Sequence, residues 1–170
     1  TSQHDVTVNP TPTISLSTND ETCPADNDGE IATTLSGGLS NIQYIKLTQT
    51  YVNGDAWQQV EEIQAFEVFT NTNVALSSNG AIATASSYFT NDPSFAPSLV
   101  NDGISTGYNF WHSNTTNAGE WVMVDLGAPK NIEYLRIFNR EDCCWERGQS
   151  MLLELFDSGN NVVYETTVDL

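Results

Sequence analysis

Basic residues are scarce in this chain. Lys and Arg together number 5 among 170 residues, against 22 Asp and Glu, so the formal net charge is −17. The five cations are Lys46, Lys130, Arg136, Arg140 and Arg147. An excess of negative charge repels phosphate backbones and anionic lipid, so nucleic acid and membrane surfaces are disfavoured as partners.

Long apolar runs are missing as well. No stretch reaches the roughly 18 residues of a membrane-spanning helix, and residues 1–13 lack the basic end and apolar stretch of a signal peptide. We therefore expect no membrane insertion and interpret the chain as a mature segment or an excised module. Charged residues make up only 16% of the chain, while Asn, Thr and Ser abound. This composition is typical of extracellular β-proteins, so we expect a secreted protein.

Motifs of common enzyme classes are also absent. The sequence has no P-loop, no GxSxG and no His cluster that could hold a catalytic metal. Its many carboxylates could include the acid and nucleophile of a glycosidase, but no spacing singles out one pair. We therefore expect a binding module rather than an enzyme.

Cysteine is rare, and two of the three cysteines are neighbours: Cys23, Cys143 and Cys144. This spacing fits neither a zinc ribbon nor a CxxC redox motif. In an oxidising compartment the adjacent pair can close into a small disulfide ring, although the Cα separation across one peptide lies below the usual disulfide range. The alternatives are one thiol in the core and one outside, or a bond from either to Cys23.

What the sequence does contain, from about Asn41 onward, is a hydrophobic period of two with frequent turn residues. This pattern predicts an all-β fold, an antiparallel β-sandwich or barrel, without helices of any length. Turns are expected at Gly127–Lys130 and Asp157–Asn160, and Leu135 and Ile137 are expected to face the core. The clearest strands are 43–48, 63–69, 121–126, 132–139, 151–156 and 162–167.

The first forty residues differ from the rest. Residues 1–13 are rich in Thr, Pro and Val and are interpreted as a linker. Residues 14–40 hold two short strand-like runs and resemble, weakly, the start of β-sandwich repeats in bacterial surface adhesins. They are either a remnant of an upstream domain or strands that pack on the following module, and we favour the second. The expected organisation is therefore a linker at 1–13, a β-rich extension at 14–40 and a module at 41–170.

One segment carries a family motif. NREDCCWERG, at 139–148, is similar to the signature of the fucolectins, or F-type lectins: Arg, any residue, Asp, four residues, then Arg or Lys, with two adjacent cysteines inside. The family also places a His before a Trp-containing strand that ends in VDLG, as NFWHSN and EWVMVDLG do here. The separation of 27 residues between His112 and Arg140 is one more than usual, which we attribute to a turn insertion around Ala118–Glu120.

Two further segments, 73–89 and 96–106, resemble the opening of discoidin-like, galactose-binding-type sandwich domains, the fold that contains this family. The order differs, however: a segment like Tyr44–Phe69 closes the related domains, whereas here it comes first. We interpret this as circular permutation, which a fold with neighbouring termini tolerates. The alternative is that this segment belongs to an upstream copy.

The resemblance implies a site for fucose. Arginine presents a rigid planar fork of N–H donors that can bracket sugar hydroxyls, a neutral His112 can offer one ring N–H, and Asp142 would orient the arginines. A disulfide ring and nearby aromatic rings would cover the apolar edge of the sugar. The candidate residues are His112, Arg140, Arg147, Asp142, Cys143, Cys144, Trp111, Phe110, Tyr108 and Trp145, with Phe89 as a further aromatic candidate.

The simpler alternative is a surface ion-pair network formed by Arg140, Asp142 and Arg147, worth little to stability. Two of only three arginines nevertheless flank the adjacent cysteines at the family spacing, with His112 upstream. This conjunction favours sugar binding.

The family also has a structural calcium at the loop SLVNDGIS, which here is residues 98–105. By resemblance, Asp102 and Glu62 would supply side-chain oxygens. Asn101 replaces Asp102 if the register slips by one, and the alternative is an ordinary Asp-Gly turn. Carbonyl or amide oxygens would come from Leu99, Ile104, Asn109 and Glu61.

Together these features predict a non-catalytic carbohydrate-binding module that recognises L-fucose or a fucose-containing polysaccharide such as a fucan. The Thr/Pro linker would attach it to a secreted polysaccharide-active enzyme or adhesin. The alternative is a discoidin-like adhesion module for a protein partner, which predicts no response to free fucose and a large exposed apolar loop tip.

Overall fold

The architecture is that of an all-β protein. The structure, a computed structural model, describes residues 13–19, 30–50, 57–140 and 143–170. Its longer strands are β1 (Thr13–Asn19), β2 (Glu30–Gln49), β4 (Glu62–Glu67), β5 (Ile82–Ala85), β7 (Trp121–Phe138), β8 (Met151–Phe156) and β9 (Val162–Val168). Two-residue strands, β3 (Gln59–Val60) and β6 (Trp111–His112), pair with each other. The described helices are short 3-10 turns: η1 (Ser77–Asn79), η2 (Phe89–Asn91), η3 (Pro93–Phe95), η4 (Pro97–Asn101) and η5 (Trp145–Gly148).

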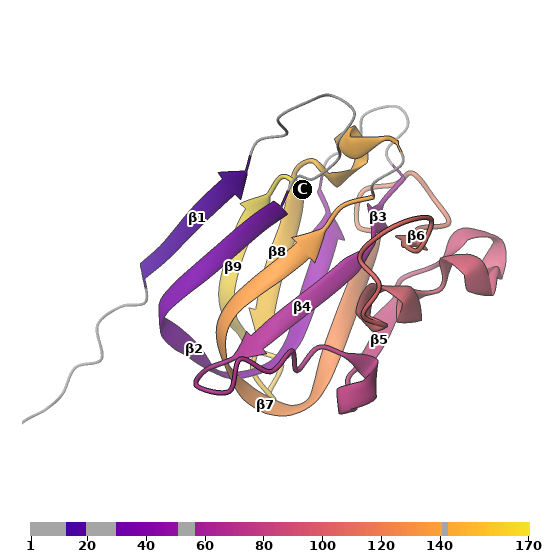
Figure 1. Ribbon diagram of the computed structural model, residues 1–170. Helices are drawn as coiled ribbons and strands as arrows, with labels where there is room; N and C mark the ends of the chain where they lie inside the picture. The colour runs from indigo at the N-terminus through magenta and orange to yellow at the C-terminus, as the bar shows by residue number, and fades with distance from the viewer. Residues whose placement is uncertain (1–12, 20–29, 51–56, 141–142) are drawn as a thin grey trace, which may run out of the picture.

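Two long strands create both layers of the sandwich. β2 and β7 are antiparallel partners along most of their length, and both curve from one layer into the other (Figure 1). In one layer the second half of β7 lies between β4 and the first half of β2, which also pairs with β1. In the other layer the first half of β7 pairs with β5, and the second half of β2 pairs with β8, which pairs with β9. This antiparallel sandwich confirms the predicted fold class.

β7 bends from one layer into the other at a segment where the sequence predicts a turn. Gly127–Lys130 was expected to connect two strands, but β7 runs through this segment without a break, so this prediction is wrong. The physical reason is that β2 continues alongside, and its register with β7 shifts between Thr34 and Tyr44, which absorbs the bend as bulges do. Gly127 has φ +76, a conformation that glycine adopts without strain, at the start of the bend. The turn predicted at Asp157–Asn160, between β8 and β9, is confirmed.

The hydrophobic core fills the space between the two layers. Leu135 and Ile137 of β7 are buried, as the alternation predicts. Every second residue of β8 is also buried, and the remaining positions of that strand are partly exposed. The largest fully buried apolar side chains are Trp111, Phe110, Ile42, Ile45, Leu47, Ile63, Ile132, Leu135, Met151, Leu153 and Leu155.

The β-rich segment before Asn41 lies in the same sheet as the rest. β2 extends from Glu30 to Gln49 as one strand, and its first half pairs with Tyr134–Phe138 of β7. Most of the predicted linker and Cys23 lie outside the described residues. Within the described ranges, no helix is both long and apolar enough to cross a bilayer.

Candidate carbohydrate-binding site

The predicted sugar-binding residues come from two loops at one end of the sandwich. β7 ends at Phe138, opposite Glu62 at the start of β4, so the cysteine-containing loop leaves the sheet at this end. β6 carries His112 and pairs with β3, which directly precedes β4. The two segments therefore meet beside the start of β4, where β3, β6 and η5 lie in Figure 1.

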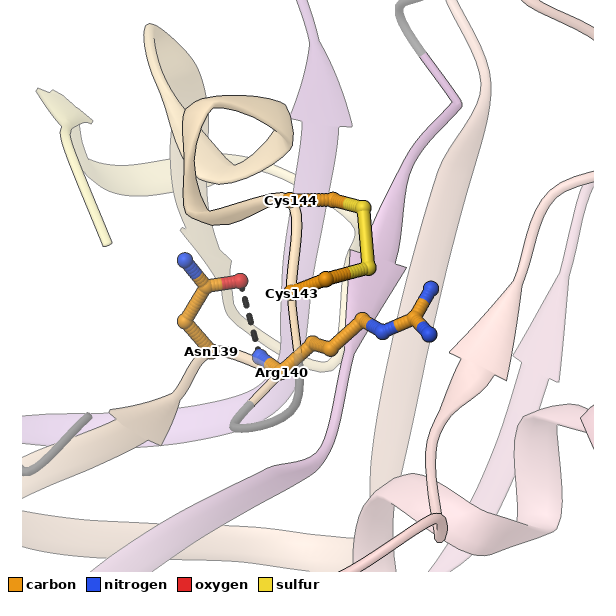
Figure 2. The surroundings of a disulfide bond; sticks show 4 residues. All are labelled: Asn139, Arg140, Cys143 and Cys144. Carbon is orange, nitrogen blue, oxygen red and sulfur yellow. Dashed lines mark hydrogen bonds between the residues drawn. A yellow bond between two sulfur atoms is a disulfide. The ribbon is translucent and has the colours of Figure 1, made fainter. Parts of the chain in front are cut away.

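Cys143 and Cys144 form a disulfide, which confirms the predicted ring. The ring shapes the backbone that follows it: Cys144 has φ +66, in the left-handed region, and its carbonyl accepts a hydrogen bond of 3.0 Å from the Arg147 amide in η5. Cys143 is exposed and Cys144 is partly exposed. In Figure 2 the sulfur atoms and the Arg140 side chain project from the loop on the same side. The disulfide therefore offers polarisable sulfur at the surface, next to an arginine.

Arg140 is held by aromatic rings. Its guanidinium carbon lies 4.4 Å from the centre of the Phe110 ring and 5.4 Å from that of Tyr108. The Arg140 amide also donates a hydrogen bond of 2.8 Å to the Asn139 side chain (Figure 2). A stacked guanidinium gains cation–π attraction while its N–H groups point outward in the plane of the fork. The rings thus hold the Arg140 guanidinium in a fixed position at the start of the cysteine-containing loop.

His112 lies in an aromatic cage. Its ring centre is 5.0 Å from that of Trp57, 4.9 Å from Phe89 and 5.7 Å from Phe95, and the residue is 9% exposed. Nδ1 is 2.7 Å from the Ser113 carbonyl, which can only accept, so Nδ1 carries the proton. This contact is compatible with a neutral ring, in which Nε2 is an acceptor, and with a charged ring, in which Nε2 is a donor, so the role of His112 as a donor to a sugar hydroxyl stays a prediction.

A buried carboxylate fixes the loop that carries His112. Glu120 accepts hydrogen bonds from the hydroxyls of Ser86, Ser87 and Thr115, the last two at 2.7 and 2.6 Å. Burial tends to raise the pKa of Glu120, but these three hydrogen bonds outweigh it, so the pKa is lowered and the carboxylate stays charged. The Ser113 hydroxyl accepts from the Gln58 amide and donates to Thr115, which ties the same loop to the segment before β3.

Two aromatic candidates require correction. Trp111 is fully buried and donates its indole N–H to the Ser87 carbonyl at 2.9 Å, so it belongs to the core and cannot contact a sugar. Phe110 is 1% exposed, and it supports Arg140 instead of lining the surface. Both residues of β6, Trp111 and His112, are buried, and the alternation of a strand this short could not predict it.

The other candidates have different positions. Tyr108 is 65% exposed and remains available for contact with a ligand, and Phe89 is partly exposed beside His112. Asp142 and the side chain of Trp145 lie outside the described residues. Sequence reasoning missed Phe95 and treated Trp57 as packing, although both rings belong to the cage around His112. Phe95 ends η3 and Trp57 precedes β3, and neither position follows a periodic pattern from which the sequence could have assigned a role.

The predicted calcium ligands form a second, acidic cluster nearby. Glu62 is fully buried; one carboxylate oxygen accepts from the Gly103 amide at 3.4 Å, and the other, Oε1, has no hydrogen-bond partner among the described residues. The Asn109 side chain lies 3.2 Å from both Asp102 carboxylate oxygens and from the Ile104 carbonyl. Glu61 is buried as well. No group of three or more His, Cys, Asp and Glu side chains with metal-binding geometry occurs within the described ranges.

Burial raises the pKa of Glu62 to about 8, with a partly opposing hydrogen bond from the Gly103 amide and a further increase from the Asp102 carboxylate. The folded chain therefore keeps this proton at pH values where the unfolded chain, with the ordinary pKa of 4.5, has lost it.

We predict that, in the presence of EDTA, the free energy of unfolding is highest below the unfolded pKa and declines as pH rises from about 5 to about 8. Urea denaturation across this range measures the decline. Glu62→Gln imitates the neutral acid and should flatten this part of the profile. An equally steep decline in that variant would show that another group is responsible.

Comparison with known proteins adds one relationship. Residues 99–169 match the family described as NedA-like, galactose-binding domain, a range that contains β6 to β9 and the loop with Arg140, the disulfide and Arg147. Curated proteins and solved structures gave no match. The family match supports the discoidin-like sandwich fold and suggests a carbohydrate-binding module, a kind of domain that is generally non-catalytic.

Proposed function

We propose that this chain is a non-catalytic carbohydrate-binding module for L-fucose or a fucose-containing polysaccharide. The observation that carries the proposal is the convergence of Arg140 and His112 on one aromatic ring. The Phe110 ring centre lies 4.4 Å from the Arg140 guanidinium and 6.3 Å from the centre of the His112 ring, and the disulfide of Cys143 and Cys144 lies on the same loop as Arg140. The fucolectin signature combines the same residue types.

The chemistry of this loop end suits a deoxy sugar. Arg140 and Arg147 would donate to vicinal hydroxyls or to the ring oxygen, and His112 would form a hydrogen bond with a hydroxyl through its ring. The exposed ring of Tyr108 and the disulfide would contact the C–H face and the methyl group. Because Arg140 and His112 already pack against aromatic rings, little of their side-chain entropy is lost when the sugar binds.

A site for one sugar unit is expected to have a low binding affinity, and the biological setting follows from this. Such a module gains useful affinity when it is linked to other binding domains or to an enzyme that acts on the same polymer. We therefore place the chain in a secreted, polysaccharide-active enzyme or an adhesin. The permuted strand order belongs to the same proposal: Tyr44–Gln49 of β2 and all of β4 fall within Tyr44–Phe69, and both strands lie beside β7, which follows them in sequence.

A protein partner is the second candidate. It is favoured by two exposed apolar side chains on the loop after η4, Ile104 at 49% and Tyr108 at 65%. An adhesion module would use such a loop tip as a contact surface.

We predict that calorimetric titration with L-fucose gives saturable binding and that galactose gives less. Arg147→Ala and His112→Ala should each reduce the affinity at least about tenfold, because each removes a directed hydrogen bond of about 1.5 kcal/mol or more. Lys130→Ala, which removes a cation from the bend between the layers, is the matched control. Unchanged affinity in both site variants would contradict the site, and a folded chain that gives no heat with any sugar would favour the protein partner.

We also propose that a structural calcium ion joins the acidic cluster to β4. The donors present fit such an ion: a buried carboxylate oxygen of Glu62 without a partner, the Asp102 carboxylate, and carbonyl or amide oxygens from Ile104, Asn109, Leu99 and Glu61. Hard oxygen ligands of this kind are what calcium prefers. The Asn109 side-chain amide can turn by 180° to present its oxygen where the nitrogen now faces Asp102. Bound calcium would displace the Glu62 proton, offset the charge of both carboxylates and anchor the loop next to the sugar site.

We predict that 1 mM calcium, about the concentration for which extracellular sites are tuned, raises the melting temperature measured after EDTA treatment by several degrees. Asp102→Asn and Glu62→Gln should each abolish most of this increase. Asp157→Asn, in the turn between β8 and β9, is the control and should keep it. An increase of equal size in all variants would exclude this cluster as the site.

A further inference from the structure

A hollow lies on the sheet, apart from the loop site. It is on the outer face of the layer formed by the first half of β7 and the second half of β2 with β8. Its volume is about 290 Å³, close to the lower limit of about 300 Å³ for small-molecule sites. The hollow is open to solvent rather than enclosed, and its lining residues are Tyr44, Lys46, Trp121, Met123, Phe156 and Asn160.

Strand register assembles this surface from three cross-strand rows. In the first row Tyr44 lies opposite both Asp125 and Phe156; in the second, Lys46 lies opposite Met123 and Glu154. In the third, Thr48 is paired with both Trp121 and Leu152. The rows are two residues apart, so together they extend about 14 Å along the strands, longer than one sugar ring.

Rings and hydrogen-bonding groups alternate across these rows. The Lys46 ammonium is 3.2 Å from the Glu154 carboxylate and 6.0 Å from the ring centres of both Trp121 and Phe156. The two charged side chains remain 26% and 15% exposed, so each can still accept a further polar partner. At one edge, the Gln43 amide donates to the Tyr44 hydroxyl at 3.1 Å and to Asp125 at 3.3 Å.

This composition favours a sugar chain over a protein. The centre of a protein interface is usually depleted of charge, because covering an ion pair with apolar groups costs desolvation energy. Sugar hydroxyls can instead donate to Glu154 and accept from Lys46, while their C–H faces lie against the rings. The net charge of −17 repels acidic polymers, which leaves a neutral saccharide as the occupant.

We propose that this face, which extends across the sheet between the side chains of Trp121 and Phe156, is a second carbohydrate-binding site. It would bind neutral oligosaccharides of two or more units along the strands. It rests on the proposed function only in the general class of ligand, since it shares none of its residues with the loop site. The module would then bind one sugar unit at the loops and several consecutive units of a polysaccharide on the sheet.

The test uses the full chain labelled with ¹⁵N and saturated with L-fucose, so that the loop site is already occupied. Neutral hexasaccharides with glucose, xylose, mannose or desulfated fucose backbones are then added one at a time. We expect at least one of them to shift the Trp121 indole signal and the Lys46 and Met123 amides. Trp121→Ala and the milder Tyr44→Leu should each weaken this binding about tenfold, whereas fucose affinity stays the same.

Controls separate this site from the loop site. Arg147→Ala should lose fucose but retain the hexasaccharide shifts, and Phe69→Ala, which removes a fully exposed ring at the turn after β4, should change neither. If no hexasaccharide shifts these signals, the second site is wrong even where fucose binds. The second site is also wrong if the shifts persist in both ring variants. It is wrong as well if sedimentation without added sugar shows that the chain dimerises through this face.

Discussion

The pairing of β2 with β7 is the interaction on which the rest of the structure depends. Each strand contributes to both layers, so a single antiparallel ladder, interrupted by bulges at the bend, fixes how the layers face each other. All the other long strands in the described sheet pair with one of these two, except β9, which joins through β8. Because β7 ends at Phe138, this ladder also determines where the loop with Arg140 and the disulfide leaves the sheet.

The loop site needs more than the ladder, because its residues lie in segments with little regular structure. Three contacts compensate for this. Glu120 accepts hydrogen bonds from three hydroxyls of two loops, Phe110 supports the Arg140 guanidinium, and the backbone carbonyl of Ser113 accepts from Nδ1 of His112. Contacts of this kind hold segments that lack the backbone hydrogen bonds of a strand. The rigidity of the site therefore depends on buried groups that do not themselves contact a ligand.

Sequence reasoning succeeded where the physics is local and periodic. Alternation placed Leu135 and Ile137 in the core and located the strands of β7, β8 and β9, and adjacency alone indicated the disulfide ring. It failed at Gly127–Lys130 because a short segment with Gly and Pro predicts a turn unless the partner strand is known to continue beside it. It also placed Trp111 in the sugar site, since burial of a two-residue strand is decided by tertiary packing and not by period.

The two proposed sites differ in what keeps them intact. The loop site contains a disulfide and lies beside a network of hydroxyls around Glu120, which redox conditions and pH can alter. The sheet face depends only on strand register, and a shift by one residue would turn the apolar row of Ile45 and Leu47 outward and expose the core. Register there is consequently protected by the stability of the whole domain. In such a module the sheet face would stay bound to a polymer, while the affinity of the loop site for a particular sugar would change with redox conditions and pH.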